Sequence, residues 1–449
     1  MPVPLADAFA AALRTDAQAA VAWTAAGTCD RRGLAAMANE LAATLPAAAR
    51  VAISVRDPLR FLAAVLAVWQ RDGCAILLDA ADPLAPRKDL AAHFGAAAIV
   101  VDGPELSSAP IDAPRPAPAA RFAAIKLTSG STGVPRGIGV TAQALFADAD
   151  QLERTMGIGD GDRVFAAVPM SFSYGVGNLL VPALCRGRTL VLPAASDPLG
   201  FLQAMRAGGP TVLPAVPALL RALLQNAREL PASLRLVLSA GAALPPAVAR
   251  DFAAKFGRAV HSFYGSTESG GICYDAAGGA AEAGAVGAPV DGVEVAIDDE
   301  SRVVVRSAAV GEALDGSGNP GGGAFRAPDL GTFRDGRLVL LGRVGDVIDV
   351  GGHKVHPREI EDVVGQLAGV VEVLVVPWRD ADGRASTAAL VAGTGVDEAA
   401  VRRHCSARLP AAKVPRCIRI VAALPRSSRG KVLAADVQRL LAPGGEAQP

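Results

Sequence analysis

Residue types suited to binding phosphate are concentrated in one stretch of the chain, Leu127-Thr-Ser-Gly-Ser-Thr-Gly-Val-Pro-Arg-Gly137. Its three glycines permit tight turns with exposed backbone N–H groups, and its four hydroxyl side chains can donate to anionic oxygens. Arg136 adds a positive charge, and no Gly-Lys-Ser/Thr triplet follows, so the Walker pattern is excluded. The stretch follows an apolar run at 122–127 and therefore predicts a phosphate-binding loop after a buried strand. A flexible surface turn is the alternative.

A second stretch, Phe263-Tyr-Gly-Ser-Thr-Glu268, follows an apolar strand pattern and combines an aromatic ring, two hydroxyls and a carboxylate. Tyrosine can stack on a nucleobase, threonine can donate to phosphate, and glutamate can ligate Mg²⁺. The stretch therefore predicts contacts with a nucleotide and its metal ion. A plain turn with a solvated Glu268 is the alternative.

Three stretches in the C-terminal half carry further candidates. Asp329 can accept both hydroxyls of a ribose, although an Asp-Leu-Gly before a turn also occurs in plain hairpins. The glycines between 342 and 352 can form a hinge and a surface of close approach, or simply a turn-rich hairpin. Lys431 offers a point charge on a long stem, which suits a developing negative charge. The chain has only six lysines: Lys88, Lys126, Lys255, Lys354, Lys413 and Lys431.

The elements that must position these residues alternate between strands and helices. Strands separated by helices of about ten to fifteen residues imply parallel βαβ units. The expected strands are 51–55, 74–78, 98–101, 163–168, 189–192, 211–215 and 234–239, with helices such as 32–45 and 58–71 between them. Residues 110–118 contain four prolines and predict an extended connector.

Beyond residue 283 the pattern changes to short β runs, and 311–323 predicts a mobile glycine-rich loop. A final set comprises helices at 357–367 and 398–409 and strands at 371–376, 387–392 and 418–421. Since 449 residues exceed one ordinary core, we expect an α/β fold with two domains. Residues 1–342 would form a large domain of βαβ subdomains with a small β-rich part, and 343–449 a small α+β domain.

Composition excludes several function classes. Lysine plus arginine equals aspartate plus glutamate, 44 against 44, so no net charge attracts nucleic acid or an anionic membrane. Six cysteines without close pairing predict reduced thiols rather than a zinc site. The first residues lack a signal-peptide pattern, and the apolar stretch 165–184 contains prolines and polar residues that suit a pocket better than a lipid-facing helix. We therefore expect a cytoplasmic protein.

The five stretches, in this order and at these separations, resemble the superfamily of adenylate-forming enzymes. It includes acyl-CoA synthetases, aryl acid ligases, adenylation domains of nonribosomal peptide synthesis and beetle luciferase. The resemblance covers about residues 25–440. It implies an AMP-forming acid:thiol ligase, in which a carboxylate attacks the α-phosphate of Mg·ATP to give an acyl-adenylate and pyrophosphate. The thiol of CoA, or of the phosphopantetheine on a carrier protein, then displaces AMP.

The resemblance also implies a role for each matching residue. Lys431 would bridge the reacting carboxylate and the α-phosphate, Thr267 would contact the α-phosphate, and Glu268 would bind Mg²⁺. Asp329 and Arg343 would hold the ribose hydroxyls. The remaining nucleotide-binding positions would be Thr128, Ser129, Gly130, Ser131, Thr132, Gly133 and Arg136 at the phosphates, and Gly241, Ala242, Ala243, Tyr264, Gly265 and Ser266 at and beside the adenine.

The same resemblance implies a mobile small domain, which rotates between the half-reactions about a hinge near 343–346. Gly345 matches the pivot, and Gly351 with Gly352 would contact the pantetheine arm. The acid pocket would be lined by Phe172, Ser173, Ala240, Gly270, Gly271 and Ile272. Amino-acid-activating relatives have an aspartate where Ser173 stands, so we expect a non-amino aryl or aliphatic acid, with Ser173 free to bond a ring hydroxyl or simply backbone or solvent.

The chain departs from the family pattern at two places. Arg136 stands where lysine is usual, and Ala327-Pro328 precedes the ribose aspartate in place of the usual Thr-Gly. Two alternatives to an acid:CoA ligase stay open. One is an adenylyltransferase that loads only a separate carrier protein, and the other is a non-catalytic nucleotide-binding protein.

Overall fold

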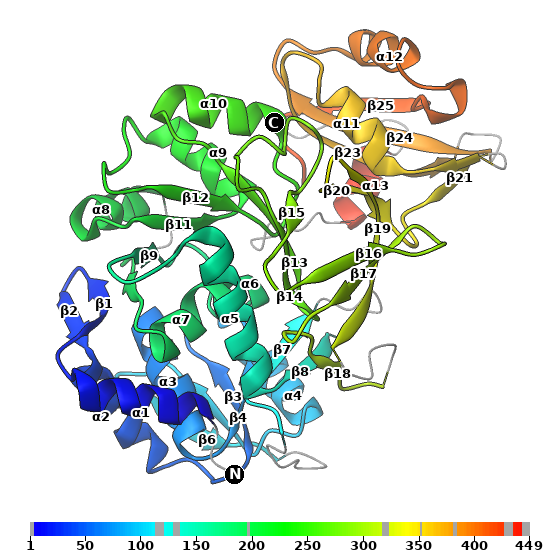
Figure 1. Cartoon of the computed structure of the whole chain (residues 1–449). Helices are drawn as coiled ribbons and strands as arrows, with labels where there is room; N and C mark the ends of the chain where they lie inside the picture. The colour runs from blue at the N-terminus through cyan, green and yellow to red at the C-terminus, as the bar shows by residue number, and fades with distance from the viewer. Residues whose placement is uncertain are drawn as a thin grey trace.

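The computed structural model describes residues 4–112, 121–128, 135–194, 198–316, 323–350, 353–379, 384–425 and 434–441. Figure 1 shows a large N-terminal domain, coloured from blue to yellow-green, with a small C-terminal domain in orange and red at one end. The expected α/β fold with a large and a small domain is confirmed. The boundary between residues 342 and 343 stays a prediction.

The first large sheet has nine strands in the order β15-β14-β13-β12-β11-β9-β10-β1-β2. Its central strands run parallel, as the βαβ pattern predicts, while β2, β14 and β15 pair antiparallel at the two edges. The strands are β1 (Ala20–Thr24), β2 (Gly27–Asp30), β9 (Arg163–Phe165), β10 (Thr189–Val191), β11 (Val212–Ala215), β12 (Leu236–Ser239), β13 (His261–Ser266), β14 (Gly270–Tyr274) and β15 (Ala288–Pro289).

The second large sheet has seven strands in the order β18-β8-β7-β4-β3-β5-β6. Strands β3, β4, β5 and β7 are parallel, and β6, β8 and β18 pair antiparallel with their neighbours. The strands are β3 (Arg50–Ser54), β4 (Cys74–Leu77), β5 (Ala98–Val101), β6 (Ser107–Pro110), β7 (Ala124–Thr128), β8 (Arg136–Val140) and β18 (Glu312–Ala313).

Helices cover both sheets, and alternate residues of each strand face different cores. In β4, Ala75 and Leu77 face the largest core, while Cys74 and Ile76 face a smaller one beneath α4. The largest core also contains α3, α5 and α7, and a third core beneath α8, α9 and α10 covers the other face of the nine-stranded sheet. The helices are α1 (Pro4–Thr15), α2 (Arg31–Ala42), α3 (Pro58–Gln70), α4 (Leu84–His93), α5 (Ala142–Met156), α6 (Ser173–Gly175), α7 (Val181–Cys185), α8 (Pro198–Gly208), α9 (Pro217–Asn226) and α10 (Pro246–Phe256).

A four-stranded sheet, β16-β17-β19-β20, leads toward the small domain. Asp335 and Gly336, with φ of 48° and 72°, form the two-residue turn of the β19–β20 hairpin, as expected for an Asp-Gly pair. The strands are β16 (Glu294–Ile297), β17 (Arg302–Arg306), β19 (Ala324–Arg334) and β20 (Arg337–Arg343).

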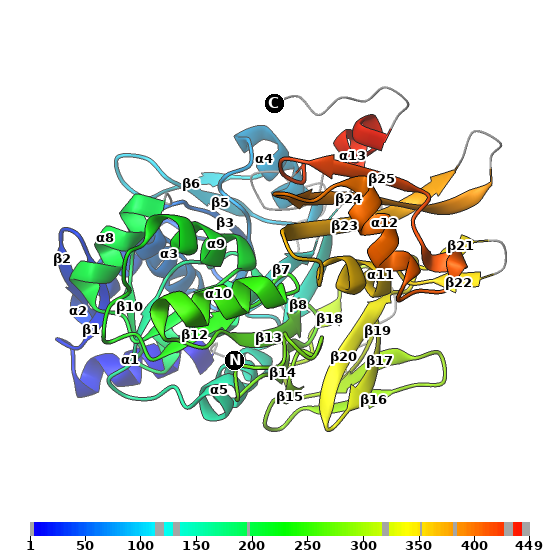
Figure 2. The same ribbon diagram turned by 90° about the horizontal axis from the view of Figure 1, so that it is seen from above.

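The small domain has its own apolar core, whose buried members all lie between Ile348 and Ile418. In Figure 2 the small domain lies beside β19 and β20. An ion pair links it to α9: Arg221 Nη2 lies 3.5 Å from Glu372 Oε1. Its elements are β21 (Ile348–Val350), β22 (His353–Val355), α11 (Pro357–Val364), β23 (Val370–Arg379), β24 (Ala385–Gly393), α12 (Glu398–Ser406), a 3₁₀ turn (Ala411–Lys413), β25 (Cys417–Val421) and α13 (Ala434–Leu441).

Two sequence-based expectations for loops are wrong in part. The predicted glycine-rich loop at 311–323 contains β18, whose Glu312 and Ala313 pair with Gly139 and Ile138 of β8. The proline-rich connector was expected from residue 110, but Pro110 is the last residue of β6. Both short strands depend on pairing with distant residues, which local residue patterns do not report.

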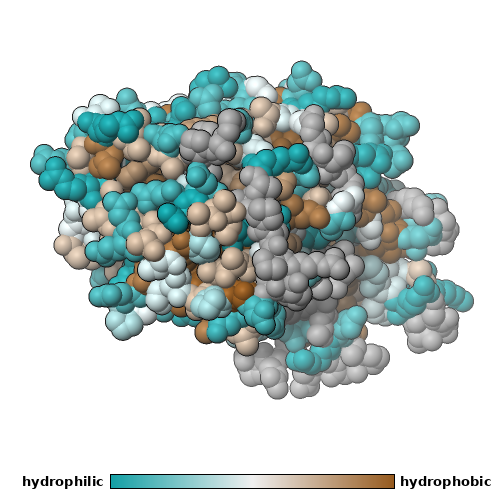
Figure 3. All heavy atoms as spheres, turned by 90° about the horizontal axis from the view of Figure 1, so that it is seen from below, coloured by the Kyte–Doolittle hydropathy of each residue, from teal (hydrophilic) through white to brown (hydrophobic). Residues whose placement is uncertain are grey.

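Among the described residues, no helix has the length and apolar character needed to cross a bilayer. The stretch 165–184 forms α6, a π-helical segment at Val176–Leu180 and α7, which are largely buried. On the face in Figure 3, teal residues are mixed with small groups of brown ones.

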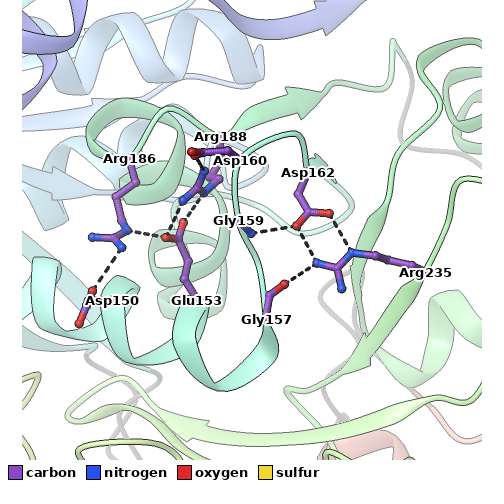
Figure 4. A network of polar contacts seen from close by, with 9 residues as sticks. All are labelled: Asp150, Glu153, Gly157, Gly159, Asp160, Asp162, Arg186, Arg188 and Arg235. Carbon is purple, nitrogen blue, oxygen red and sulfur yellow. Dashed lines mark hydrogen bonds and ion pairs between the residues drawn. The ribbon is translucent and has the colours of Figure 1, made fainter.

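Next to the starts of β9, β10 and β12, arginines and carboxylates form a polar network (Figure 4). The Glu153 carboxylate on α5 accepts hydrogen bonds from both Arg186 and Arg188, and its side chain is only 5% exposed. Arg188 binds it through two nitrogens, at 2.8 and 3.1 Å. By contrast, Asp150 pairs with Arg154 and Arg186 at the surface, with a side chain that is 40% exposed.

Replacing Glu153 should therefore destabilise the large domain much more than replacing Asp150. Glu153→Gln leaves two arginines near a buried neutral amide, and we expect a loss of about 3 kcal/mol in the free energy of unfolding. Asp150→Asn removes an exposed pair and should cost less than about 1 kcal/mol. Urea unfolding followed by tryptophan fluorescence, from Trp23 and Trp69 in the large domain and Trp378 in the small one, measures both, and equal losses would contradict the prediction.

Candidate active site

The candidate site lies where neighbouring parallel strands of the nine-stranded sheet end, which is where α/β sheets usually bind ligands. Strands β11, β12 and β13 run side by side, and the predicted turn 241–243 directly follows β12. Residues 241–243 are exposed. Gly241 has a φ of +79°, a left-handed backbone conformation that glycine adopts without strain. Ala240, by contrast, is buried at the end of the strand.

The strand β13 continues into a tight hairpin that carries Thr267 and Glu268 in its turn. Two hydrogen bonds hold the turn in place. Within it, Ser266 Oγ accepts from the Ser269 N–H at 3.1 Å, and from outside it the Gly311 N–H donates to the Glu268 carbonyl at 2.8 Å. Both Thr267 and Glu268 are half-buried, and no described residue hydrogen-bonds the Thr267 hydroxyl or the Glu268 carboxylate. A braced turn thus presents a hydroxyl and a carboxylate for a ligand.

Tyr264, Asp329 and Arg343 are joined in one hydrogen-bonded network, although they come from two different sheets. The Tyr264 hydroxyl donates to Asp329 Oδ2 at 2.9 Å, and Arg343 Nε donates to Oδ1 at 2.9 Å. Asp329 and Arg343 are also paired across the β19–β20 hairpin. Burial, followed by the negative charge of Asp329, raises the pKa of Tyr264, so its hydroxyl remains a proton donor to the carboxylate.

A fourth group, which the sequence motifs do not include, is the buried Lys126 of β7. Its side chain lies among the core residues with only 2% exposure, and its Nζ donates to Ser173 Oγ at 3.2 Å. Burial lowers the pKa of Lys126, and the negative charges of Asp148 and Glu268 oppose that effect. The signal is visible in the sequence: a lysine inside an apolar run, in a chain with only six lysines.

Asp148 on α5 is buried against Gly270 and Gly271 of the predicted acid pocket and against Gly177. Its Oδ1 accepts from the Gly271 N–H at 2.9 Å. A Cβ on Gly270 would lie 2.3 Å from the same oxygen, and a Cβ on Gly177 would lie 2.7 Å from Oδ2. Burial raises the pKa of Asp148, opposed by the positive charge of Lys126. Glycine is therefore required beside this carboxylate.

The predicted acid-pocket residues range from members of the largest core, Ala240 and Ile272, to partly exposed residues beside it. Ser173 contacts Lys126 and also lies 3.5 Å from the Ser266 carbonyl oxygen, so it links β7 to the Thr267 hairpin. Phe172 is 37% exposed at the start of α6, whereas Ile272 is fully buried in the core. Gly270 and Gly271 face Asp148.

Several predicted residues lie at the border of the described ranges or beyond them. Thr128 ends β7 and Arg136 begins β8, so the two flank the predicted phosphate loop. Arg136 Nε donates to Asp315 at 3.0 Å, an exposed pair that supports β8. Gly345 has a φ of +101° in the turn that follows β20. Outside the described residues lie Ser129, Gly130, Ser131, Thr132, Gly133, Gly351, Gly352 and Lys431.

The donor set fits a magnesium ion that arrives with a nucleotide. Magnesium is commonly held by one or two carboxylates together with phosphate oxygens and water. Glu268 supplies one such carboxylate next to the predicted phosphate positions, and the described residues contain no cluster of three or more metal-ligating side chains. The site thus has the ligands of a nucleotide-borne Mg²⁺ rather than those of a metal caged by protein alone.

Comparison with known proteins agrees with this geometry. Residues 102–316 match the family model described as AMP-binding enzyme, and residues 359–431 match the AMP-binding enzyme C-terminal domain. A 4-hydroxybenzoate–CoA/benzoate–CoA ligase of Rhodopseudomonas palustris is 31% identical, over 68% of this chain and 62% of that protein. A sulfoacetate–CoA ligase of Cupriavidus necator is 31% identical, over 73% and 68%. The solved structure of ATP-bound MatB from Rhodopseudomonas palustris superimposes with a TM-score of 0.83 at 25% identity, covering 96% of this chain and 98% of that one.

The two large sheets, the hairpin with Thr267 and Glu268, and the small domain place the chain in the class of two-domain enzymes that the family models and the solved structure represent. Within that class, the chain belongs to the AMP-binding enzyme family, and so to the adenylate-forming superfamily. The aligned region covers less than two thirds of the benzoate–CoA ligase, 62% of its length.

The close approach of Asp148 to the hairpin gives a prediction for Gly270. In Gly270→Ala, the new Cβ meets both the strain of a φ of +71° and the Asp148 carboxylate, so the free energy of unfolding should fall by more than about 3 kcal/mol. Gly284 has a similar φ of +68°, but a methyl group there would meet no atom within 4 Å, so Gly284→Ala should cost only about 1 kcal/mol. Thermal unfolding of both variants measures the difference, and equal costs would contradict a role for Asp148.

Proposed function

We propose that the protein activates a non-amino carboxylic acid with Mg·ATP and transfers the acyl group from the adenylate to a thiol. The observation that carries this proposal is the Tyr264–Asp329–Arg343 network beside the Thr267–Glu268 turn. It places an aromatic ring, a carboxylate and a hydroxyl–carboxylate pair where β13 meets the β19–β20 hairpin. Neither member of that pair has a side-chain hydrogen bond to another described residue. Family membership supports the same reaction.

In this proposal the network binds the nucleoside part of ATP. Tyr264 and the 241–243 turn contact the adenine, and Asp329 accepts the ribose hydroxyls, with Arg343 beside it. A carboxylate has about four lone-pair sites, so Asp329 can accept from the ribose while it keeps its bonds to Tyr264 and Arg343. Those two bonds fix the direction of the carboxylate before the nucleotide arrives, which lowers the entropic cost of binding.

The phosphates lie toward the loop between β7 and β8 and the Thr267 hairpin. Thr128, with the predicted loop residues that follow it, holds the β- and γ-phosphates, and Thr267 donates to the α-phosphate. Glu268 holds Mg²⁺, which neutralises charge on the phosphate oxygens when it is bound. The carboxylate oxygen of the acid attacks the α-phosphorus, the bond to pyrophosphate breaks, and Lys431 stabilises the added negative charge.

The second half-reaction requires the small domain to rotate. The thiol sulfur attacks the acyl carbon and AMP leaves, with Gly351 and Gly352 beside the pantetheine arm. We propose Gly345 as the pivot of the hinge near 343–346, since β20 ends at Arg343 and Gly345 has a φ of +101°. A methyl at Gly345 would meet no atom within 4 Å, so it is backbone conformation that favours glycine there.

The surroundings of Ser173 support a non-amino acid. Its hydroxyl accepts from the buried Lys126 ammonium, so an α-ammonium group placed beside Ser173 would meet a cation. The relatives' names include ligases for benzoate and for sulfoacetate, and both name CoA as the acceptor. We therefore propose CoA as the acceptor, with the phosphopantetheine of a separate carrier protein as the alternative.

Acid-dependent exchange of pyrophosphate into ATP tests the first half-reaction. A panel of aryl, aliphatic and α-amino acids should show exchange with non-amino acids. Exchange with α-amino acids alone would overturn the proposed substrate class, and no exchange with any acid would favour a non-catalytic protein. Addition of CoA or of candidate carrier proteins, with mass measurement of the thioester, then identifies the acceptor.

Asp329→Asn should weaken ATP binding. The amide cannot accept from both Arg343 and Tyr264 and also hold the ribose, so we expect the KM for ATP to rise roughly tenfold or more. Asp335→Asn, in the exposed turn of the same hairpin, should leave this KM unchanged. Exchange rates measured against ATP concentration compare the two, and an unchanged KM in Asp329→Asn would contradict ribose binding by this residue.

Lys431→Ala separates the two half-reactions. Loss of its charge should nearly abolish pyrophosphate exchange, because no other proposed group stabilises the attacking carboxylate and the α-phosphate together. Thioester formation from a supplied acyl-adenylate should continue, since the rotated domain withdraws Lys431 from the site. A similar loss in both assays would argue against rotation.

A further inference from the structure

We propose that Lys126 is a specificity-determining residue, which selects carboxylic acids that carry a second anionic group such as a carboxylate or a sulfonate. The proposal rests on the proposed function and names the substrate class more closely. It is carried by the position, the hydrogen bonds and the charge surroundings of one buried lysine.

The position of Lys126 places it on the acid side of the site. Neighbouring residues of β7 alternate between two cores, with Ala124 in the largest core and Ile125 in the core beneath α4. Lys126 shares the direction of Ala124, because side chains alternate along a strand. It therefore points between the two large sheets, where it meets Ser173 of the predicted acid pocket.

Among the residues that the structure describes, the hydrogen bonds of Lys126 are incomplete. An ammonium group has three donors, and fully buried lysines are rare unless they are paired. Ser173 Oγ, at 3.2 Å, is the single acceptor that the described residues offer to Nζ, although Lys126 is only 2% exposed. Two N–H donors remain for an acceptor with more than one oxygen, which a carboxylate or sulfonate provides.

The charges around Lys126 also leave room for an anion. Asp148 and Glu268 both act on it electrostatically, but within the described part of the chain no ion pair joins either carboxylate to Nζ. Asp148 is directed to the Gly271 N–H and enclosed by Gly177 and Gly270, so it cannot move to Lys126 freely. When Glu268 ligates Mg²⁺, its charge is shared with the metal, and the lysine loses part of its compensation.

The second anionic group would be distinct from the reacting carboxylate. The reacting carboxylate must lie beside the α-phosphate, where Lys431 is proposed to bridge the two and Thr267 to contact the phosphate. Ser173 Oγ lies between Lys126 Nζ, at 3.2 Å, and the Ser266 carbonyl oxygen, at 3.5 Å, next to the Thr267 turn. An acid that reaches both places spans the pocket with one anionic end at each side.

Paired acids that differ only in the second group test this proposal. Pyrophosphate exchange is measured with butanoate against butanedioate, propanoate against 3-sulfopropanoate, and benzoate against benzene-1,4-dicarboxylate, whose two anionic groups lie at opposite ends of the molecule. We expect the wild-type chain to favour the member with two anionic groups by roughly 100-fold in kcat/KM, since a buried donor left unpaired penalises the other member. Lys126→Met, of similar length, should lose or invert that preference, and Lys88→Met, on the exposed face of α4, should keep it.

The outcomes separate this proposal from the proposed function. If monoanionic acids are activated as well as their partners, and Lys126→Met leaves the ratio unchanged, Lys126 serves only as a buried counter-charge for Asp148 and the proposal is overturned. If Lys126→Met slows exchange equally for both members of each pair, the lysine contacts the reacting carboxylate instead, which also overturns it. If no acid of any class supports exchange, the proposed function itself fails.

A binding measurement guards against a variant that folds poorly. The shift in melting temperature on adding each acid is measured with a non-hydrolysable ATP analogue present. The wild-type chain and the Lys88→Met control should be stabilised more by the dianionic member of each pair, and Lys126→Met should show no such difference. A Lys126→Met variant that keeps the wild-type difference would overturn the proposal even if its activity were low.

Discussion

The position of Asp329 is the constraint on which the candidate site depends. Its carboxylate joins Tyr264 of the nine-stranded sheet to Arg343 of the β19–β20 hairpin through two 2.9 Å hydrogen bonds. The carboxylate is buried, where an unpaired charge would be costly, and both bonds offset that cost. The same two bonds hold the strand with the Thr267–Glu268 turn against the sheet that leads to the small domain. In the proposed function, nucleotide binding and the attachment of the β19–β20 hairpin to the nine-stranded sheet thus share one residue.

A second polar group lies deeper, between the two large sheets. Lys126, Asp148 and Ser173 lie among residues of the largest apolar core, and replacing buried charged groups by packed hydrophobic residues is often neutral for stability. Such groups are retained where they serve a ligand or fix a unique arrangement. The glycines at 270 and 271 are part of the same arrangement, because the hairpin that carries Glu268 can approach Asp148 only without side chains there.

Much of the fold could be predicted from the sequence, because buried parallel strands appear as continuous apolar runs. β5 was predicted with its observed ends, whereas β9 ends at Phe165 rather than 168, where the chain turns toward Phe172 and Ser173. The two-residue β18 was not predicted, since it exists only through pairing with β8. The motif residues Tyr264, Asp329 and Arg343 were predicted to share a nucleotide site, and they contact one another. No role could be predicted for Lys126, because its partner Ser173 lies 47 residues away in another layer.

The Asp329 network also determines where a hinge can lie. Arg343 is held by Asp329, and the Val344 N–H donates to the Pro328 carbonyl at 2.7 Å, so the chain first becomes free to turn at Gly345. Beyond them the small domain has its own core, and its ion pair to the large domain, Arg221 with Glu372, is long at 3.5 Å. A small domain with its own core can rotate relative to the large domain. If Asp329 binds the ribose as proposed, its carboxylate stays in place while the small domain moves.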